Sequence, residues 1–229
     1  MSVRKSLTSV AALALTAGAA AADMPQSFGI LEFGPDNTLF VADSAGGAIH
    51  AYALPGGGDA PEQDAAFNLL DVDQLVTETL GATGRVIYSD LVVHPVTREA
   101  FVSATTTVGG VETGAVLAIS RDGSVRVLDL DAYPSSKFTL QNTADAGVTF
   151  WRDIPAPSLT VTDLDYANGE LFVSGVSTGE FASTLRRVPF PFEGSATSTS
   201  IEIYHAAHNQ NETRAPIRAM AVVDIDGTS

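Results

Sequence analysis

The stretch from Phe28 to Leu54 constrains the fold most, because it has the pattern of three short β-strands joined by tight turns. Residues 34–37, Gly-Pro-Asp-Asn, form a dense cluster of turn formers between two apolar runs, which predicts a hairpin. A third run, residues 48–54, alternates apolar residues with small or polar ones at the strand period of two. Three consecutive antiparallel strands would make up most of a four-stranded sheet.

Weaker copies of this stretch return later in the chain. Leu31 aligns with Leu164, and the alignment superposes the turn and the apolar run that follows it. Another copy contains Leu91, and a fourth starts near Met220. The spacings between these aligned residues are 60, 73 and 56, longer than the roughly 40 to 50 residues of tight propeller repeats. Long loops between strands would account for the excess.

The copies predict an all-β, β-propeller-like fold over residues 23–229, with about three four-stranded blades plus the start of a fourth. The pattern also predicts a hairpin at 104–113 and a short helix from Asp71 to Leu80. The remaining expectations are outer strands at 121–130 and 184–192, a polar connection at 193–200, and a long loop at 131–158.

Three and a fraction blades fall short of the usual four to eight. One interpretation is that an N-terminal strand completes the last blade and closes a small ring. The other, which the blade count favours, is that the chain is a partial copy of a longer propeller. An incomplete ring would leave strand edges and apolar faces exposed, so we expect the expressed chain to self-associate.

The run from Leu39 to Ser44, Leu-Phe-Val-Ala-Asp-Ser, carries a family resemblance. It follows a turn and precedes a glycine-flanked strand, and in this respect the chain resembles the periplasmic β-propellers of the NHL and YncE-like kind over about residues 27–229. The resemblance implies a propeller fold. Its motifs mark the fold and carry no activity.

Residues 1–22 have the pattern of a secretory signal peptide. Arg4 and Lys5 precede an apolar segment from Leu7 to about Ala19, and small residues then lead to Asp23. An uncleaved membrane anchor is the rival interpretation, but the apolar run is shorter than the roughly 18 to 20 residues that span a bilayer. We therefore expect export to the periplasm or beyond, with no membrane attachment after cleavage.

The composition limits the partners of the exported chain. Without residues 1–22 it holds 10 basic against 27 acidic residues, and such a surface repels nucleic acid and anionic lipid. Cysteine is absent, which excludes disulfides, thiolate metal sites and a cysteine nucleophile. A small molecule or another protein remains the expected partner.

Asp90 and Asp163 are the leading candidate site residues. Each precedes the aligned leucine of an innermost strand, where Ile30 stands in the first copy. Innermost strands line the central channel of a propeller, so the two carboxylates could hold a cation such as Ca²⁺. The alternative, favoured because two carboxylates make a weak calcium site, is that each accepts hydrogen bonds from the backbone of a neighbouring blade.

Calcium-dependent lactonases of the gluconolactonase and regucalcin-like kind are the relevant comparison. Those propellers hold a channel metal with Glu and Asn side chains and typically show Asn-Gly at the start of an innermost strand. Here the pairs are Ser89-Asp90 and Thr162-Asp163. The departure argues against lactonase activity.

His205 and His208 form an H-x-x-H motif, which on a helix would place both imidazoles on one face for Zn²⁺ or Cu²⁺. No third ligand is evident, and two exposed histidines in a polar loop are the commoner case. The segment leads through Arg214 and Arg218 into the next channel strand, so Arg218 is a candidate ligand contact or a partner for Asp163.

Trp151 could form an aromatic lip for a sugar, although packing is the commoner role of a lone tryptophan. The sequence therefore favours a non-enzymatic propeller that binds a ligand or a protein. The alternative is a channel-site enzyme, either a metal-dependent lactonase or hydrolase or a quinoprotein-like oxidoreductase. The number of ligands that converge in the channel would separate the two, and the sequence offers Asp90 and Asp163.

Overall fold

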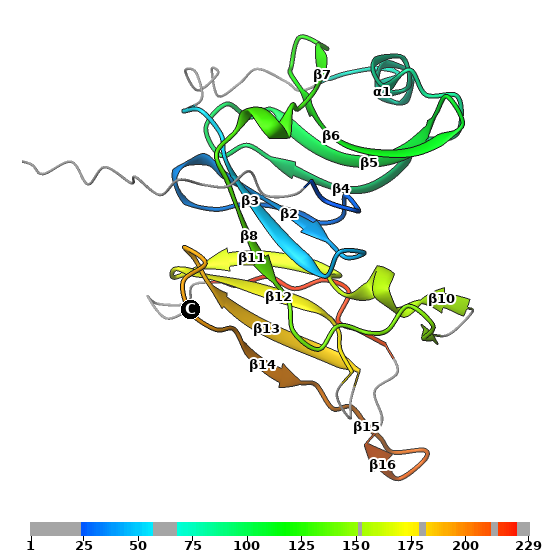
Figure 1. Cartoon of the computed structure of the whole chain (residues 1–229), viewed down its shortest axis with the longest axis vertical. Coiled ribbons are helices and arrows are strands. Elements are labelled where there is room, and N and C mark those ends of the chain that lie inside the picture. Colours follow the sequence, from blue (N-terminus) through cyan, green and yellow to red (C-terminus); the bar gives the residue numbers. More distant parts are fainter. Residues whose placement is uncertain (1–23, 57–67, 151–152, 179–181, 212–214, 224–229) are drawn as a thin grey trace, which may run out of the picture.

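Three four-stranded antiparallel sheets stack face to face in the computed structural model (Figure 1). The structure describes residues 24–56, 68–150, 153–178, 182–211 and 215–223. The signal-peptide prediction at 1–22 lies outside these residues. Within them, no helix is long and apolar enough to cross a membrane.

The first sheet has the strand order β1-β2-β3-β8 and confirms the predicted hairpin. Its strands are β1 (Leu31–Phe33), β2 (Thr38–Asp43), β3 (Ala48–Ala53) and β8 (Ser135–Thr139). The turn between β1 and β2 contains a single 3-10 turn, Pro35–Asn37. Asp36 and Asn37 both adopt positive φ there, which these two residue types tolerate better than most.

The second sheet has the order β4-β5-β6-β7. Its strands are β4 (Ile87–Val93), β5 (Ala100–Val108), β6 (Val111–Ile119) and β7 (Val125–Val127). Gly109 and Gly110 form the predicted two-residue turn, both at positive φ, as a type I′ hairpin turn requires. The predicted helix is also confirmed as α1 (Val72–Leu80), which ends at Gly81 in the left-handed conformation.

The third sheet has the order β11-β12-β13-β14. Its strands are β11 (Asp163–Ala167), β12 (Glu170–Val176), β13 (Ser183–Pro189) and β14 (Thr197–Ser200). The prediction of an outer strand at 184–192 was wrong, because β13 is the third strand. The outer strand β14 lies in the expected polar connection, and its Thr-Ser-Thr-Ser sequence is exposed on both faces, which removes the alternating pattern.

Residues 131–158 do not form only the loop that the sequence predicted. They contain β8, which pairs with β3 and completes the first sheet after the chain has built the second. They also contain the short pair β9 (Thr149–Phe150) and β10 (Ile154–Pro155). Two 3-10 turns flank these strands, η2 (Leu130–Ala132) and η4 (Ala156–Leu159).

The first sheet lies between the other two, and its strands β2 and β3 are buried on both faces except at Ala53. Leu39 and Val41 of β2 pack toward the second sheet, against Phe101. Phe40 and Ala42 point the other way and pack with residues of the third sheet, including Leu164 and Val173. This explains why all six residues of β2 are buried, since a strand covered on both faces needs no polar side. Complete burial of a side chain such as Phe40 contributes about 1.5–3 kcal/mol.

The first strand of each sheet contains the aligned leucine: Leu31 in β1, Leu91 in β4 and Leu164 in β11. We call these three the inner strands, because β1 contacts both β4 and β11. The fourth aligned residue, Met220, lies in an extended segment at 215–223 that is not part of a strand. This segment contacts β11, because the backbone N–H of Met220 donates to the side chain of Asp163.

We predict that Gly175→Ala destabilises the protein by about 1–3 kcal/mol, the usual cost of overpacking a filled site. A Cβ on Gly175 of β12 would overlap the backbone carbonyl of Thr160, which closes η4 onto the sheet. Gly147→Ala is the matched control, because a Cβ there meets nothing within 4 Å. Urea unfolding of both variants measures the effect. Equal midpoints for the two variants would contradict the packing of η4 on β12.

Candidate functional site

The inner strands bring four carboxylates into mutual electrostatic range. Asp90 comes from β4 and Glu32 from β1, while Asp163 and Asp165 come from β11. Burial is the largest cause of the raised pKa of Asp90 and of Glu32; the charge on Asp163 adds to the rise at Asp90, and the charges on Asp165, Asp90 and Asp163 add to the rise at Glu32. Asp90 and Asp163 are therefore near enough to influence each other electrostatically, and a shared ligand between them stays a prediction.

Asp90 forms a bridge between the second sheet and the first. Its Oδ2 accepts a hydrogen bond from the backbone N–H of Leu31 at 2.8 Å. It also accepts the backbone N–H of Leu91, the next residue. Burial raises the pKa of Asp90, and these two hydrogen bonds oppose that rise.

Asp163 repeats this arrangement between the third sheet and segment 215–223. Its Oδ1 accepts the N–H of Leu164, the next residue, at 3.1 Å, and its Oδ2 accepts the N–H of Met220 at 2.6 Å. Leu31 and Met220 are aligned in the sequence, so equivalent donors meet equivalent acceptors. Asp165 continues the contact by accepting the N–H of Val222.

A serine stands opposite each of these aspartates on the neighbouring strand. Ser103 pairs with Asp90 and donates its hydroxyl to the Gly29 carbonyl at 2.6 Å. Ser174 pairs with Asp163 and donates to the Ile217 carbonyl at 3.4 Å. In each Asp–Ser pair, the aspartate thus accepts a backbone N–H of the adjacent segment and the serine donates to a backbone carbonyl of the same segment.

The interface between the first and third sheets has no such polar pair. Ile30 stands where the aspartates stand in the other two inner strands, and the backbone N–H of Ala42 donates to the Ile30 carbonyl. Both side chains pack in the apolar cluster shared with Leu164. Ser44, which follows β2, adds a polar contact, because its hydroxyl donates to the Val161 carbonyl at 3.1 Å and accepts the Val161 N–H at 3.2 Å. The contact is therefore mainly hydrophobic, and a serine takes the bridging role that the aspartates have elsewhere.

These contacts match the structural interpretation of Asp90 and Asp163, in which each accepts hydrogen bonds from neighbouring backbone. Among the described residues, no group of three or more histidine, aspartate or glutamate side chains could hold a metal ion. The Ca²⁺ hypothesis stays a prediction, and it would require the aspartates to exchange backbone donors for a cation.

Glu32 is a site residue that the sequence reasoning missed. Burial, followed by the charge on Asp165, raises its pKa to about 7, although Oε1 accepts the N–H of Phe33 at 3.0 Å. Its alignment with Asp165, one residue after the aligned leucine in each copy, was the available signal. A carboxyl group that titrates near neutral pH can exchange protons under physiological conditions.

His205 and His208 lie on a small hairpin and not on a helix. Its strands are β15 (Tyr204–His205) and β16 (Gln210–Asn211), and it projects from the end of the molecule beyond the third sheet (Figure 1). The two imidazole rings are nearly parallel with centroids 6.0 Å apart, and both residues are exposed. The hairpin is separate from the inner strands. Trp151 and Arg214 lie outside the described residues.

A cavity of about 480 Å³ opens where the inner strands begin. Residues from or next to all three sheets line it, and Arg218 is the only charged residue among the described lining residues. The side chains of Ser89, Thr105 and Arg218 also line it, and none of the three has a hydrogen-bond or ion-pair partner within the part of the chain that the structure describes. Its apolar walls include Phe28, Ile30, Pro155 and Pro157.

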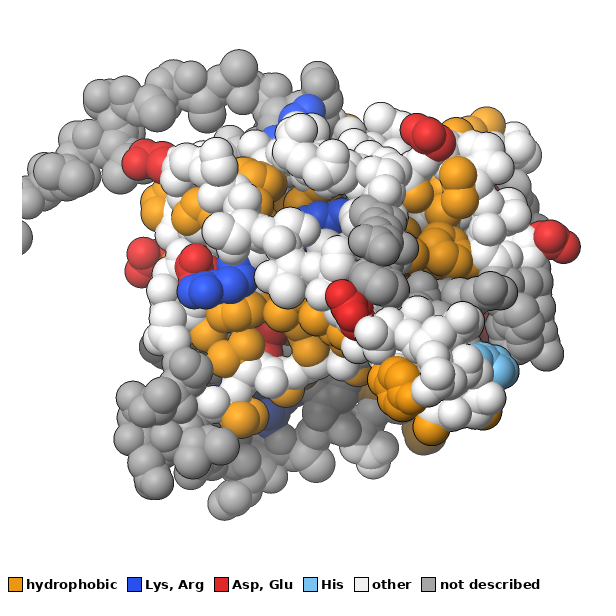
Figure 2. Space-filling view, turned by 90° about the horizontal axis from the view of Figure 1, so that it is seen from below, with side chains coloured by type: hydrophobic (Ala, Val, Ile, Leu, Met, Phe, Trp, Pro, Cys, Tyr) orange, Lys and Arg blue, Asp and Glu red, His pale blue; other side chains and the backbone are white. Residues whose placement is uncertain are grey.

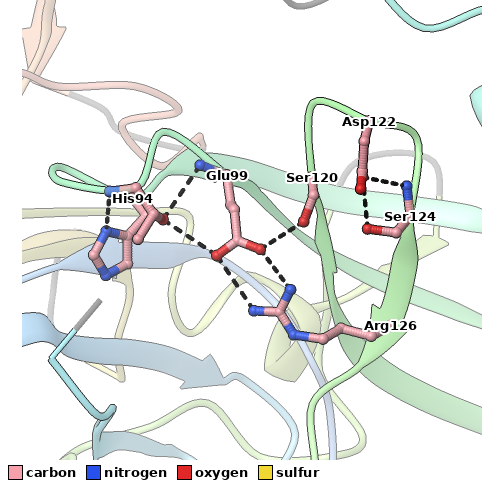
Figure 3. A network of polar contacts seen from close by, with 7 residues as sticks. His94, Glu99, Ser120, Asp122, Ser124 and Arg126 are labelled. Atoms are coloured by element: carbon pink, nitrogen blue, oxygen red, sulfur yellow. Dashed lines mark hydrogen bonds and ion pairs between the residues drawn. The ribbon is translucent and has the colours of Figure 1, made fainter. Parts of the chain in front are cut away.

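A second polar cluster lies at the opposite end of β4 and β5 (Figure 3). The Glu99 carboxylate accepts hydrogen bonds from Arg126 at 2.5 and 3.3 Å and from Ser120 at 2.7 Å. Hydrogen bonding to Arg126 is the main reason that the pKa of Glu99 is lowered. His94 is buried, and its Nδ1 accepts the backbone N–H groups of Val96 and Thr97. These residues are paired with one another, which indicates a structural role in holding the turns.

Comparisons of the chain with protein-family models, with curated proteins and with solved structures found no match. The chemistry of the cavity and of the inner strands is therefore the basis for assigning a function.

We predict that Glu32→Gln becomes increasingly stable relative to the unmodified protein as pH rises from 5 to 8. A carboxyl group whose folded-state pKa is raised binds its proton more tightly in the folded state, so its contribution to stability falls between its ordinary value of 4.5 and about 7. Glutamine does not ionise, and its amide oxygen can still accept the Phe33 N–H. Thermal melts at both pH values measure the difference.

The control is Glu112→Gln on the exposed part of the β5–β6 hairpin, whose melting-temperature difference should be the same at both pH values. If the difference in melting temperature between Glu32→Gln and the unmodified protein is the same at both pH values, the prediction is wrong, and Glu32 titrates as an ordinary exposed carboxyl.

Proposed function

We propose that the protein is an exported, β-propeller-like repeat protein that binds a small molecule and does not catalyse a reaction. The three sheets would be its blades, because each places its aligned leucine in the first strand and then adds three antiparallel strands outward. The inner strands β1, β4 and β11 lie together, as they do around a propeller channel. Export is supported by the signal-peptide pattern of residues 1–22.

The observation that carries the proposal is the contrast between the carboxylates and the cavity. The aspartates of the inner strands are committed to backbone N–H groups, as would suit a structural role. The cavity beside them instead offers donors with no partner among the described residues, the hydroxyls of Ser89 and Thr105 and the guanidinium of Arg218. Free donors beside apolar walls are the usual features of a ligand site.

The chemistry of this cavity favours a polyhydroxylated ligand of the sugar or sugar-acid class. Hydroxyl groups of a sugar can accept from and donate to serine and threonine, while the apolar faces of a sugar ring suit Phe28 and the prolines. Arg218 adds a charged donor that a carboxylate would use. A volume of about 480 Å³ is within the range of small-molecule sites.

An enzymatic function is the second candidate, and Glu32 is the observation in its favour. A carboxyl group with a pKa of about 7 can act as a general acid or base. The lactonase, hydrolase or quinoprotein-like reactions proposed from the sequence would need further groups beside it. Turnover that is abolished by Glu32→Gln would favour this candidate over the binding module.

We predict that galacturonate binds the protein and raises its melting temperature in a concentration-dependent way, with galactose binding more weakly. Arg218→Gln should weaken galacturonate binding about ten-fold or more, because it removes a charge-assisted hydrogen bond. It should leave galactose binding almost unchanged. Isothermal titration calorimetry measures both affinities.

Arg98→Gln is the matched control, since Arg98 is exposed and lies in the β4–β5 turn, away from the cavity lining. Ser89→Ala should weaken the binding of both galacturonate and galactose. If neither compound binds, or if all three variants behave alike, the assignment of this cavity as the binding site is wrong.

A further inference from the structure

One of the three aligned leucines is in a different environment from the other two. Leu31 and Leu164 are 2% and 3% exposed because another sheet packs against each of them. Leu91 occupies the same place in the second sheet and is 58% exposed. The face of the second sheet that carries Leu91 therefore has the pattern of a sheet-stacking surface, and none of the sheets in the described residues covers it.

The residues around Leu91 form an apolar cavity of about 470 Å³. Tyr88 and Val93 flank Leu91 on β4, and both are more than 40% exposed. Helix α1 covers the rest of this face, where Val76 is fully buried against the sheet. A hydrogen bond of 2.8 Å from the Tyr88 hydroxyl to Asp73 ties the helix to β4 at the border of the cavity.

The opposite end of the stack carries a complementary surface. Segment 215–223 lies on the third sheet, with the N–H groups of Met220 and Val222 donating to aspartates of β11. The alternate residues of this segment, Ala219, Ala221 and Val223, are exposed, and Val223 is 61% exposed. Figure 2 shows this end of the molecule, where hydrophobic side chains lie in separate groups among polar, acidic and basic ones.

We propose that the Leu91 face of the second sheet binds a second copy of this chain, whose segment 215–223 packs against it. Within one chain, Leu31 is buried against the second sheet, and Leu164 against Ile30 and Ala42 of the first. The contact between copies would continue this series, with Leu91 against Ala219 and Ala221 of the partner.

Both halves of this contact are on one chain, at opposite ends of the stack, so the contact is head-to-tail. Two copies related by a two-fold axis would form it twice and close a ring. That ring would hold two sets of three sheets, within the usual four to eight blades. The mature chain has 10 basic against 27 acidic residues, and this net negative charge opposes association, so the dimer fraction should rise with salt concentration.

The absence of native cysteines makes a direct test possible. We would prepare Leu91→Cys and Ala221→Cys separately and treat each variant, and their mixture, with a short bis-maleimide cross-linker. We expect a cross-linked dimer in the mixture and little in either variant alone. Val111→Cys replaces Leu91→Cys in the control mixture, because Val111 is at least as exposed as Leu91 but lies at the tip of the β5–β6 hairpin.

Light scattering provides the second measurement on the full mature chain. We expect a dimer that Leu91→Asp converts to monomer and that Val111→Asp leaves intact. A monomeric unmodified chain at high salt would overturn the proposal. Cross-linking of Leu91→Cys with itself would overturn it too, since it would show that two second sheets face each other.

Discussion

The free edge of each inner strand is the constraint on which the rest of this structure depends. A strand that pairs on one side only leaves backbone N–H groups without partners, and burying them unpaired would cost free energy. At Leu31 of β1 the partner is an aspartate from the adjacent sheet, and the N–H of Met220, in the non-strand segment 215–223, has the same kind of partner. The same carboxylate also binds the N–H of its own next residue. One carboxylate thus accepts a backbone N–H from each of two neighbouring segments and fixes the position of these segments relative to each other.

This use of the aspartates changes the chemistry available at the centre of the stack. Asp90 and Asp163 remain close to one another, but their oxygens are engaged by the backbone. Glu32 lies among them with a pKa of about 7, so the cluster is partly protonated at neutral pH. Arg218 and the uncommitted hydroxyls lie in the cavity beside the cluster. The proposed binding function follows from this separation between carboxylates that bind backbone and donors that have no partner among the described residues.

The sequence predicts the local features well, because the turn at 34–37 and helix α1 depend on neighbouring residues. The position of β8 could not be predicted, since its pairing with β3 spans the whole second sheet and Phe138 is the only large apolar residue in the strand. The strand β14 has no apolar residue. The pKa of Glu32 depends on the proximity of Asp165 in the fold. Asp90 and Asp163 were found by alignment, but the backbone partners that decide between their two roles come from the three-dimensional structure.

Amide hydrogen exchange at Leu31, followed by NMR, tests the role of the aspartates most directly. The Leu31 N–H belongs to an inner-strand edge, and its acceptor is the Asp90 carboxylate. Slow exchange in the unmodified protein is predicted, with protection lost in Asp90→Ala at Leu31 while the amide of Val173, in the paired strand β12, stays protected. Fast exchange at Leu31 in the unmodified protein, or unchanged protection in the variant, would contradict the bridging of sheets by Asp90.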